Sequence, residues 1–243
     1  MSELSNYIDE YLKTEYTLKS TLKDSVQSKV YLYQKNDSAK QIVKISQKNR
    51  NDHVLRRLRG QHHKNTATIY EVCSNDEDVT VLEEYISGAT LRHIVEANGG
   101  TLKRELAVKY ALDICNGLVF IHSLGIIHRD IKPSNIIITE QGEAVIIDFG
   151  IARLTDDSKY SDTKNLGTAG YAVPEQFGIY QSGPVTDIYA VGVLLNELLL
   201  GVHPTIDTPK GKLGKVINKC IMAQMSKRYQ NVSELAEVLN KLL

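Results

Sequence analysis

The sequence His128-Arg129-Asp130-Ile131-Lys132-Pro133-Ser134-Asn135, followed shortly by Asp148-Phe149-Gly150, carries the strongest structural information in this chain. It combines an acid, a cation, an amide and a second acid at the spacing that phosphoryl transfer needs. Asp130 can orient and deprotonate a hydroxyl nucleophile, and Lys132 can neutralise charge on the transferred group. Asn135 and Asp148 offer the hard oxygen ligands that suit Mg²⁺. An unrelated α/β domain with a buried histidine and two surface carboxylates is the competing interpretation, and the ordered combination disfavours it.

The pattern H-R-D-x-x-x-x-N followed by D-F-G resembles the eukaryotic-like (Hanks-type) serine/threonine protein kinases, and among these the compact bacterial type. Further matches extend the resemblance over roughly residues 16–243. Residues 167–175 (GTAGYAVPE) resemble the end of an activation segment, and residues 187–192 resemble the start of the long buried helix of the large lobe. Arg228 matches the arginine that pairs with the carboxylate of the Pro-Glu motif, here Glu175.

The resemblance implies an α+β, bilobal, protein-kinase-like fold. Alternating apolar residues predict a small antiparallel sheet with one helix, at 47–59, for an N-lobe of residues 16–84. Residues 85–243 are expected to form the hinge and a mainly helical C-lobe. Helical periodicity is predicted there over 91–97, 103–124, 184–200, 212–224 and 231–242, and the apolar runs 136–138 and 144–147 predict a β-hairpin.

Residues 1–15 are expected to form an amphipathic extension. The apolar residues recur at helical spacing, at Leu4, Tyr7, Ile8, Tyr11 and Leu12. This spacing favours a short helix that packs on the small lobe. A docking helix for a partner protein is the alternative.

The resemblance also implies an ATP site. Lys44 matches the lysine that grips the α- and β-phosphates, although a lysine at a strand end is by itself an ordinary surface residue. Val30 would form the roof over the adenine and Ile137 its floor. Glu84 and Ile86 would present backbone groups to the adenine edge.

The small lobe departs from the family pattern where glycines are expected. Lys23, Ser25 and Ser28 stand at the three glycine positions of the phosphate-binding loop. Glycines let backbone N–H groups approach phosphates closely, so their absence weakens this contact. Ile42 stands where a small alanine usually faces the adenine. These changes predict weaker ATP affinity than that of a kinase with a glycine loop.

A second departure concerns the acid that pairs with Lys44. The family uses a helix glutamate, but residues 46–60 contain no Glu, and Asp52 is the only acid among them. Glu83, just before the hinge, would face the back of the nucleotide pocket. Because a buried unpaired carboxylate is costly, we expect a Lys44–Glu83 ion pair to replace the usual one.

Regulatory sites are expected in the segment between Asp148 and Glu175. In relatives with an arginine at position 129, a phosphate on this segment pairs with that arginine. Ser161 and Thr163 are the candidate autophosphorylation sites, whereas Thr168 is expected to bond Asp130 and Lys132. The basic residues of 48–64 could hold such a phosphate or an acidic partner, but a solvated helix face is the favoured interpretation.

Composition limits the kinds of binding partner and the cellular compartments that this sequence would suit. The formal net charge is zero, so no global field attracts nucleic acid or membrane. Cys73, Cys115 and Cys220 have no paired spacing, which is typical of reduced thiols in a cytoplasmic protein. No apolar stretch approaches the ~20 residues of a membrane span, and the N-terminus lacks a signal-peptide pattern. The chain ends just after its last predicted helix, so we expect neither a membrane anchor nor an outer sensor domain.

The expected function is a Ser/Thr protein kinase that uses ATP with Mg²⁺, or with Mn²⁺ in its place, to phosphorylate a protein hydroxyl. A pseudokinase or weak nucleotide-binding scaffold is the first alternative, because the glycines and the helix Glu are missing. A small-molecule kinase is the second, because only a short stretch, 205–213, stands where the family places a substrate-docking helix. The sequence makes no prediction of oligomeric state.

Overall fold

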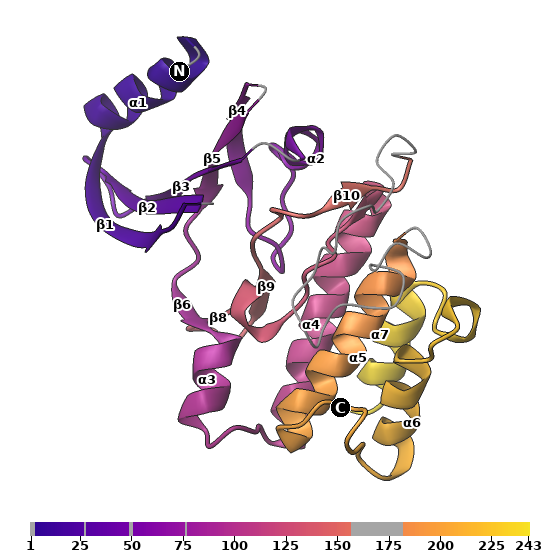
Figure 1. Cartoon of the computed structure of the whole chain (residues 1–243). Helices are drawn as coiled ribbons and strands as arrows, with labels where there is room; N and C mark the ends of the chain where they lie inside the picture. Colours follow the sequence, from indigo (N-terminus) through magenta and orange to yellow (C-terminus); the bar gives the residue numbers. More distant parts are fainter. Residues whose placement is uncertain (1–2, 27, 49–50, 76, 157–181) are drawn as a thin grey trace. The chain divides into compact units, whose positions relative to one another are not determined.

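A computed structural model describes residues 3–26, 28–48, 51–75, 77–156 and 182–243, and the side chains from residue 8 onward (Figure 1). The chain divides into two compact units. The small unit comprises residues 1–63 and 67–86, and the large unit comprises residues 64–66 and 87–243. The kinase-like α+β fold predicted from sequence is confirmed, with an antiparallel sheet in the small unit and mainly helices in the large one.

A five-stranded antiparallel sheet with the order β1-β2-β3-β5-β4 forms the small unit. Its strands are β1 (Tyr16–Asp24), β2 (Ser28–Lys35), β3 (Gln41–Lys48), β4 (Ile69–Ser74) and β5 (Asp78–Glu84). Two helices accompany it, α1 (Glu3–Glu15) and α2 (Asp52–Leu58). The helix predicted over 47–59 begins later, because Gln47 and Lys48 still pair with β5.

The two faces of this sheet carry different residues. In an antiparallel ladder, directly paired residues point to the same face, and successive residues alternate. Lys44 pairs with Tyr31 and Leu82, whereas Val43 pairs with Leu32 and Glu83. The first set belongs to what we call the α1 face (Tyr31, Tyr33, Ile42, Lys44, Cys73, Leu82), and the second to the α2 face (Val30, Leu32, Val43, Ile45, Val81, Glu83).

Each face contacts one helix, and Figure 1 shows α1 and α2 on opposite sides of the β3–β5 pair. Ile8 and Leu12 of α1 pack with Tyr16, Ile42, Cys73 and Leu82 in a buried apolar cluster. On the other face, the hydroxyl of Ser74, which lies beside Val79, donates to the carboxylate of Asp52 in α2 at 2.8 Å. Helix α1 thus packs on the sheet of the small unit through its apolar residues.

Helices dominate the large unit. They are α3 (Leu91–Ala97), α4 (Arg104–Ser123), α5 (Pro184–Leu200), α6 (Gly211–Cys220) and α7 (Val232–Asn240). Short strands accompany them: β6 (Gly88–Thr90), β7 (Ile126–Ile127), the predicted hairpin β8 (Ile136–Thr139) and β9 (Ala144–Ile146), and β10 (Arg153–Leu154). Between α5 and α6 the described chain contains no further helix, as the short stretch 205–213 predicts.

The core of the large unit lies between α4 and α5. Ile114, Leu118, Ile188 and Leu194 are completely buried there. A side chain at Gly192 of α5 would place its Cβ 2.5 Å from the Cβ of Cys220, so α6 approaches α5 closely only because residue 192 is glycine. This packing fixes α5, which supplies the residue that anchors the candidate site.

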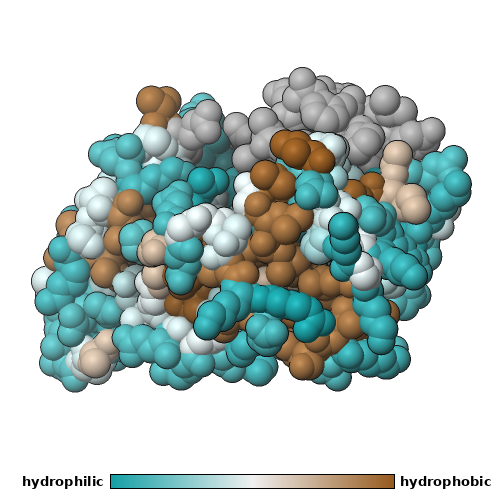
Figure 2. Space-filling view, turned by 90° about the horizontal axis from the view of Figure 1, so that it is seen from below, coloured by the Kyte–Doolittle hydropathy of each residue, from teal (hydrophilic) through white to brown (hydrophobic). Residues whose placement is uncertain are grey.

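The described surface mixes polar and apolar residues. Figure 2 shows one face, on which apolar side chains gather near the centre and hydrophilic side chains surround them. Exposed apolar area is normal for a folded protein. No helix in the described ranges is long and apolar enough to cross a membrane.

Candidate active site

The candidate active site of the large unit is built on the loop that follows β7. The fully buried carboxylate of Asp187, on α5, accepts hydrogen bonds from the backbone N–H of His128 at 2.9 Å and of Arg129 at 2.8 Å. His122 Nε2 lies 2.8 Å from the same carboxylate. Arg129 has a φ of 70°, an uncommon backbone conformation for a residue other than glycine. Asp187 therefore stabilises a strained loop at the start of the motif.

Two side chains converge on the carboxylate of Asp130. Lys132 Nζ donates to Asp130 Oδ2 at 2.7 Å, and Asn135 Nδ2 donates to the same oxygen at 2.8 Å. Asn135 Nδ2 also bonds the backbone carbonyl of Asp130 at 3.0 Å, so residues 130 and 135 are held together. The short 3₁₀ helix Pro133–Asn135 closes this turn. The structure thus brings together the three residues predicted to be catalytic.

Asp148 and Phe149 begin the second motif. Phe149 is buried and meets the ring of His128 edge-on, with centroids 5.2 Å apart. Asp148 has a φ of 66°, and its carboxylate is exposed, with Oδ1 accepting the N–H of Gly150 at 3.0 Å. Packing of Phe149 therefore fixes the backbone that presents the Asp148 carboxylate to solvent.

His128 is a fully buried residue in the core of this site. Its Nε2 lies 3.3 Å from the carbonyl of Ile147, so Nε2 carries the proton, and Nδ1 accepts the N–H of Asp130 at 3.3 Å. Burial, opposed by the nearby Asp187 carboxylate, lowers the pKa of His128 below its usual 6.5. The neutral imidazole is therefore the folded form.

We expect this histidine to make folding sensitive to acid. Below about pH 6.5 the unfolded chain binds a proton that the folded chain excludes, so stability falls as pH falls. The wild-type protein should lose unfolding free energy as the pH falls from about 7.5 to 5.5. His128→Phe should lose up to ~1 kcal/mol less over the same range. Urea unfolding measures this, with the exposed His93→Gln as control. An unchanged pH dependence in His128→Phe would contradict the assignment.

The oxygen ligands predicted for a metal fit Mg²⁺ in kind. Mg²⁺ is usually bound through one or two carboxylates, with phosphate and water oxygens completing its shell. Asp148 supplies an exposed carboxylate, and Asn135 directs its amide nitrogen at Asp130, which leaves its amide oxygen for another partner. The described residues contain no cluster of three or more His, Cys, Asp or Glu side chains able to hold a metal. A cation here would therefore depend on the nucleotide for much of its coordination.

The residues predicted to bind ATP in the small unit do not share one surface. Val30 and Glu83 lie on the α2 face of the sheet, whereas Ile42 and Lys44 lie on the α1 face. One nucleotide against one face cannot contact all four residues. Glu84 and Ile86, the residues predicted to face the adenine edge, lie at the end of the small unit. Ile137, the predicted floor of the adenine site, lies on β8 of the large unit.

The predicted Lys44–Glu83 ion pair is wrong. The two side chains point to opposite faces, and the ammonium of Lys44 instead pairs with the carboxylate of Asp9 on α1. The sequence pattern did not identify Asp9 as the partner of Lys44. Asp9 lies beside the apolar residues of α1, and this position does not show which strand residue its side chain contacts. Lys44 is therefore an anchor for α1.

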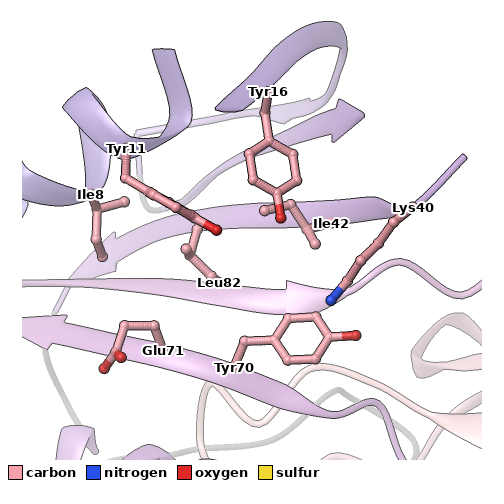
Figure 3. Close-up of a pocket in the computed structure, with 8 residues that line it drawn as sticks. All are labelled: Ile8, Tyr11, Tyr16, Lys40, Ile42, Tyr70, Glu71 and Leu82. Carbon is pink, nitrogen blue, oxygen red and sulfur yellow. The ribbon is translucent and has the colours of Figure 1, made fainter. Parts of the chain in front are cut away.

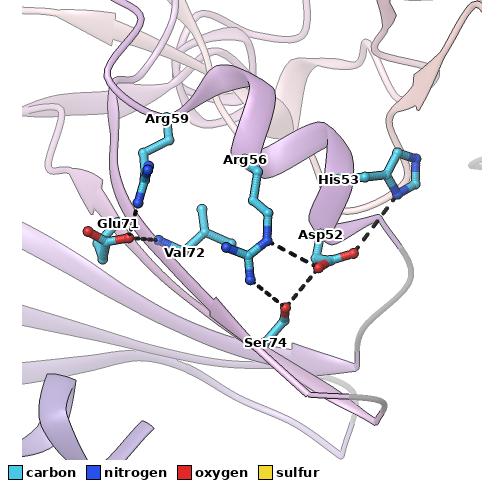
Figure 4. A network of polar contacts seen from close by, with 7 residues as sticks. All are labelled: Asp52, His53, Arg56, Arg59, Glu71, Val72 and Ser74. Carbon is cyan, nitrogen blue, oxygen red and sulfur yellow. Dashed lines mark hydrogen bonds and ion pairs between the residues drawn. The ribbon is translucent and has the colours of Figure 1, made fainter. Parts of the chain in front are cut away.

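Asp52, the other acid considered as a helix partner for Lys44, is also engaged elsewhere. Figure 4 shows its carboxylate with Arg56 and Ser74, and a further ion pair joins Arg59 to Glu71 at 2.8 Å. Burial raises the pKa of Asp52, but the hydrogen bonds from Ser74 and Arg56 outweigh it and bring the pKa below its ordinary value. Two arginines of the basic segment 48–64, Arg56 in α2 and Arg59 just after it, thus contact β4.

The proposed phosphorylation sites Ser161 and Thr163, together with Thr168 and Glu175, lie outside the described residues. Arg228, the predicted partner of Glu175, is buried and donates to the backbone carbonyls of Met222 and Val185. Asp187 is the site residue whose role the sequence did not reveal. The available signal was that Asp187 is a single acid at the start of an apolar helix. A carboxylate buried there requires hydrogen-bond partners, which points to a structural role.

Comparison with known proteins settles the family. The sequence model described as the protein kinase domain matches residues 14–243. The chain belongs to the protein kinase family.

Serine/threonine-protein kinases of bacteria are among the similar sequences. A probable one of Clostridium acetobutylicum is 33% identical over 205 residues, covering 73% of this chain and 31% of the relative. One of Clostridium perfringens is 31% identical over 235 residues, covering 84% and 34%. The probable kinase PknB of Bifidobacterium longum is 42% identical over 127 residues, covering 51% and 18%. This kinase chain spans at most about a third of these relatives' length.

Proposed function

We propose that this kinase transfers the γ-phosphoryl group of ATP to a serine or threonine hydroxyl of a protein substrate. The convergence of Lys132 and Asn135 on Asp130 Oδ2 is the observation that supports it. A carboxylate held in this way can orient a hydroxyl and accept its proton, which contributes about 10²–10⁴-fold to the rate. A protein substrate fits the family names of the relatives and the presence of Lys132 two residues after the base.

The other groups would neutralise charge. Lys132 lies next to Asp130 and would offset the negative charge of the transferred group. Asn135 and Asp148 would hold the cation, Mg²⁺ or Mn²⁺. When bound, this cation bridges and neutralises phosphate oxygens. The residues of the chain would therefore contribute by positioning the reacting groups and by neutralising charge on the phosphate.

Nucleotide binding by the small unit would differ from the usual pattern. At the end of β1, Ser25 Oγ donates to the carbonyl of Ser28 at 2.9 Å, and the N–H of Ser28 lies 3.1 Å from Ser25 Oγ. These contacts stand where glycine amides would otherwise face the phosphates. Together with the pairing of Lys44 to Asp9, they support weak ATP affinity.

We expect Lys44→Met to leave phosphoryl transfer nearly intact, within about threefold in kcat/KM, because Lys44 lies on the face covered by α1. The loss of its half-buried, charge-assisted contact with Asp9 should lower the unfolding free energy by ~1 kcal/mol. Asp9→Asn should lower stability similarly. Steady-state kinetics and urea unfolding of both variants measure this. A loss of activity above a hundredfold in stably folded Lys44→Met would contradict the assignment.

A second candidate function is a nucleotide-binding scaffold with little catalysis. It is favoured by the α2 face of β3, which carries Gln41, Val43, Ile45 and Gln47 and offers no cation to a phosphate. Incubation of the purified chain with γ-labelled ATP and Mg²⁺ or Mn²⁺ separates the two functions. We expect label on the kinase itself or on a generic Ser/Thr substrate. Binding of ATP without any transfer would favour the scaffold.

A further inference from the structure

A cavity of ≈ 340 Å³ lies within the small unit, between α1 and the α1 face of the sheet (Figure 3). This volume falls at the lower end of the range of small-molecule sites, about 300–1,000 Å³. The cavity is lined by Ile8, Tyr11, Tyr16, Lys40, Ile42, Tyr70, Glu71 and Leu82. Because the α2 face lies on the other side of the sheet, this cavity is separate from the surface that carries Val30 and Glu83.

The walls of the cavity suit a flat apolar body. Ile42 and Leu82 are buried side chains of the sheet, and Ile8 adds a third aliphatic surface from α1. Tyr11 and Tyr16 stand over them with ring centroids 5.7 Å apart and planes inclined by 59°. Aromatic and aliphatic side chains together offer a contact surface to another aromatic ring.

The polar groups of the cavity are mainly donors. The ammonium of Lys40 lies 4.5 Å from the centroid of the Tyr70 ring, and among the described residues no carboxylate pairs with it. The one lining carboxylate, Glu71, already accepts from Arg59 at 2.8 Å and from the N–H of Val72 at 3.0 Å. Figure 3 shows the Lys40 ammonium beside the Tyr70 ring and the Tyr11 and Tyr16 hydroxyls directed into the same space. Within the described part of the chain, the cavity thus holds one cation with no carboxylate partner, Lys40, and one carboxylate that is already engaged, Glu71.

We propose that this cavity binds a small planar aromatic carboxylate, with its ring against the lining tyrosine and aliphatic side chains and its carboxylate on Lys40. The hydroxyls of Tyr11 and Tyr16, which are hydrogen-bonded to each other, supply one further donor. Burial, with a hydrogen bond between Tyr16 and Tyr11, raises the pKa of Tyr16 to about 12, so its hydroxyl stays protonated at neutral pH. A site with these donors prefers an acceptor-rich ligand over a neutral amide.

Binding would also stabilise α1 on the sheet. Ile8 and Tyr11 form one wall, and Asp9 of the same helix pairs with Lys44. A ligand that contacts both α1 and β3 binds the docked helix better than the released one, and so shifts the equilibrium toward docking. This site is independent of phosphoryl transfer and can be tested in a catalytically inactive variant.

The test uses naphthalene-2-carboxylate as the probe, with naphthalene-2-carboxamide and cyclohexanecarboxylate as its neutral and non-aromatic counterparts. Titration of the full chain by calorimetry should give saturable binding of the first compound with a Kd of about 1 mM or below. Both counterparts should bind at least about fivefold more weakly. In NMR spectra, the amide signals of Ile42 and Leu82 should shift with the probe.

Lys40→Gln is the decisive variant, because Lys40 is exposed and its replacement should not disturb folding. It should weaken the carboxylate about tenfold and leave the carboxamide unchanged. Lys19→Gln, an exposed lysine on β1, is the matched control and should change neither. Absence of saturable binding, equal affinity for the three compounds, an unchanged Kd in Lys40→Gln, or shifts confined to other parts of the chain would each overturn the proposal.

Discussion

Asp130→Asn should reduce phosphoryl transfer by about 10²–10⁴-fold, because an amide can still accept a hydrogen bond but cannot take the proton of the attacking hydroxyl. The partners of the Asp130 carboxylate favour a selective loss. Lys132 and Asn135 both donate to Oδ2, and the amide oxygen of asparagine can keep these bonds. The loop should therefore remain in place while its base is lost.

Steady-state kinetics at saturating ATP with Mg²⁺ measure the effect, and circular dichroism checks the fold. Asp207→Asn, an exposed carboxylate that bonds the N–H of Thr208, is the matched control and should retain full activity. The expected change lies in kcat, with the Kd for ATP unchanged. Retention of more than about a tenth of the wild-type kcat in Asp130→Asn would show that another group serves as the base.

Asp187→Ala should destabilise the large unit by about 3–5 kcal/mol, because it leaves the buried N–H groups of His128 and Arg129 without their acceptor. Burial raises the pKa of Asp187, but the bond from His122 and the backbone amides outweigh it and keep the pKa below its ordinary value. The ionised carboxylate therefore supports the fold above the unfolded pKa, and this support is lost as pH falls through the folded pKa. Without it, the strained backbone at Arg129 should relax.

A milder substitution separates positioning from stability. Asp187→Asn keeps one oxygen acceptor and removes the charge, so we expect a folded protein with a kcat lowered about tenfold or more and a nearly unchanged KM for ATP. The matched control is Asp113→Ala, which removes a carboxylate that accepts from Lys109 and the N–H of Ala144, away from the catalytic loop. It should lose stability but keep kcat. A lowered stability with unchanged kcat in Asp187→Asn would contradict a positioning role.

The large unit could be predicted from sequence because its signals are local. The helices at 91–97 and 184–200 have the bounds that apolar periodicity predicts. The spacing from Asp130 to Asn135 lies within one turn and one short helix, so the sequence alone brings these side chains together. Asp187 is different, because its contact with residues 128 and 129 depends on tertiary packing between α5 and the loop.

The small unit could not be predicted to the same depth. Ile42, Val43 and Ile45 surround Lys44, so the hydrophobic pattern of β3 does not reveal which of its two faces turns toward α1. The pairing of β3 with β5 decides between the faces. Lys44 pairs with Leu82 on the α1 face, and Val43 pairs with Glu83 on the α2 face. The partner of Lys44 comes from α1, far away in sequence. A one-residue change in register exchanges the two faces, which is why the predicted ion pair with Glu83 failed.

The most direct test of this account measures phosphoryl transfer from γ-labelled ATP by wild type, Asp130→Asn and Lys44→Met side by side, under identical Mg²⁺ concentration. We expect activity in wild type, loss in Asp130→Asn, and activity within about threefold of wild type in Lys44→Met. This result would locate the chemistry at the large-unit loop and leave Lys44 as an anchor for α1. Full activity in Asp130→Asn, or loss of activity in a stably folded Lys44→Met, would contradict the account.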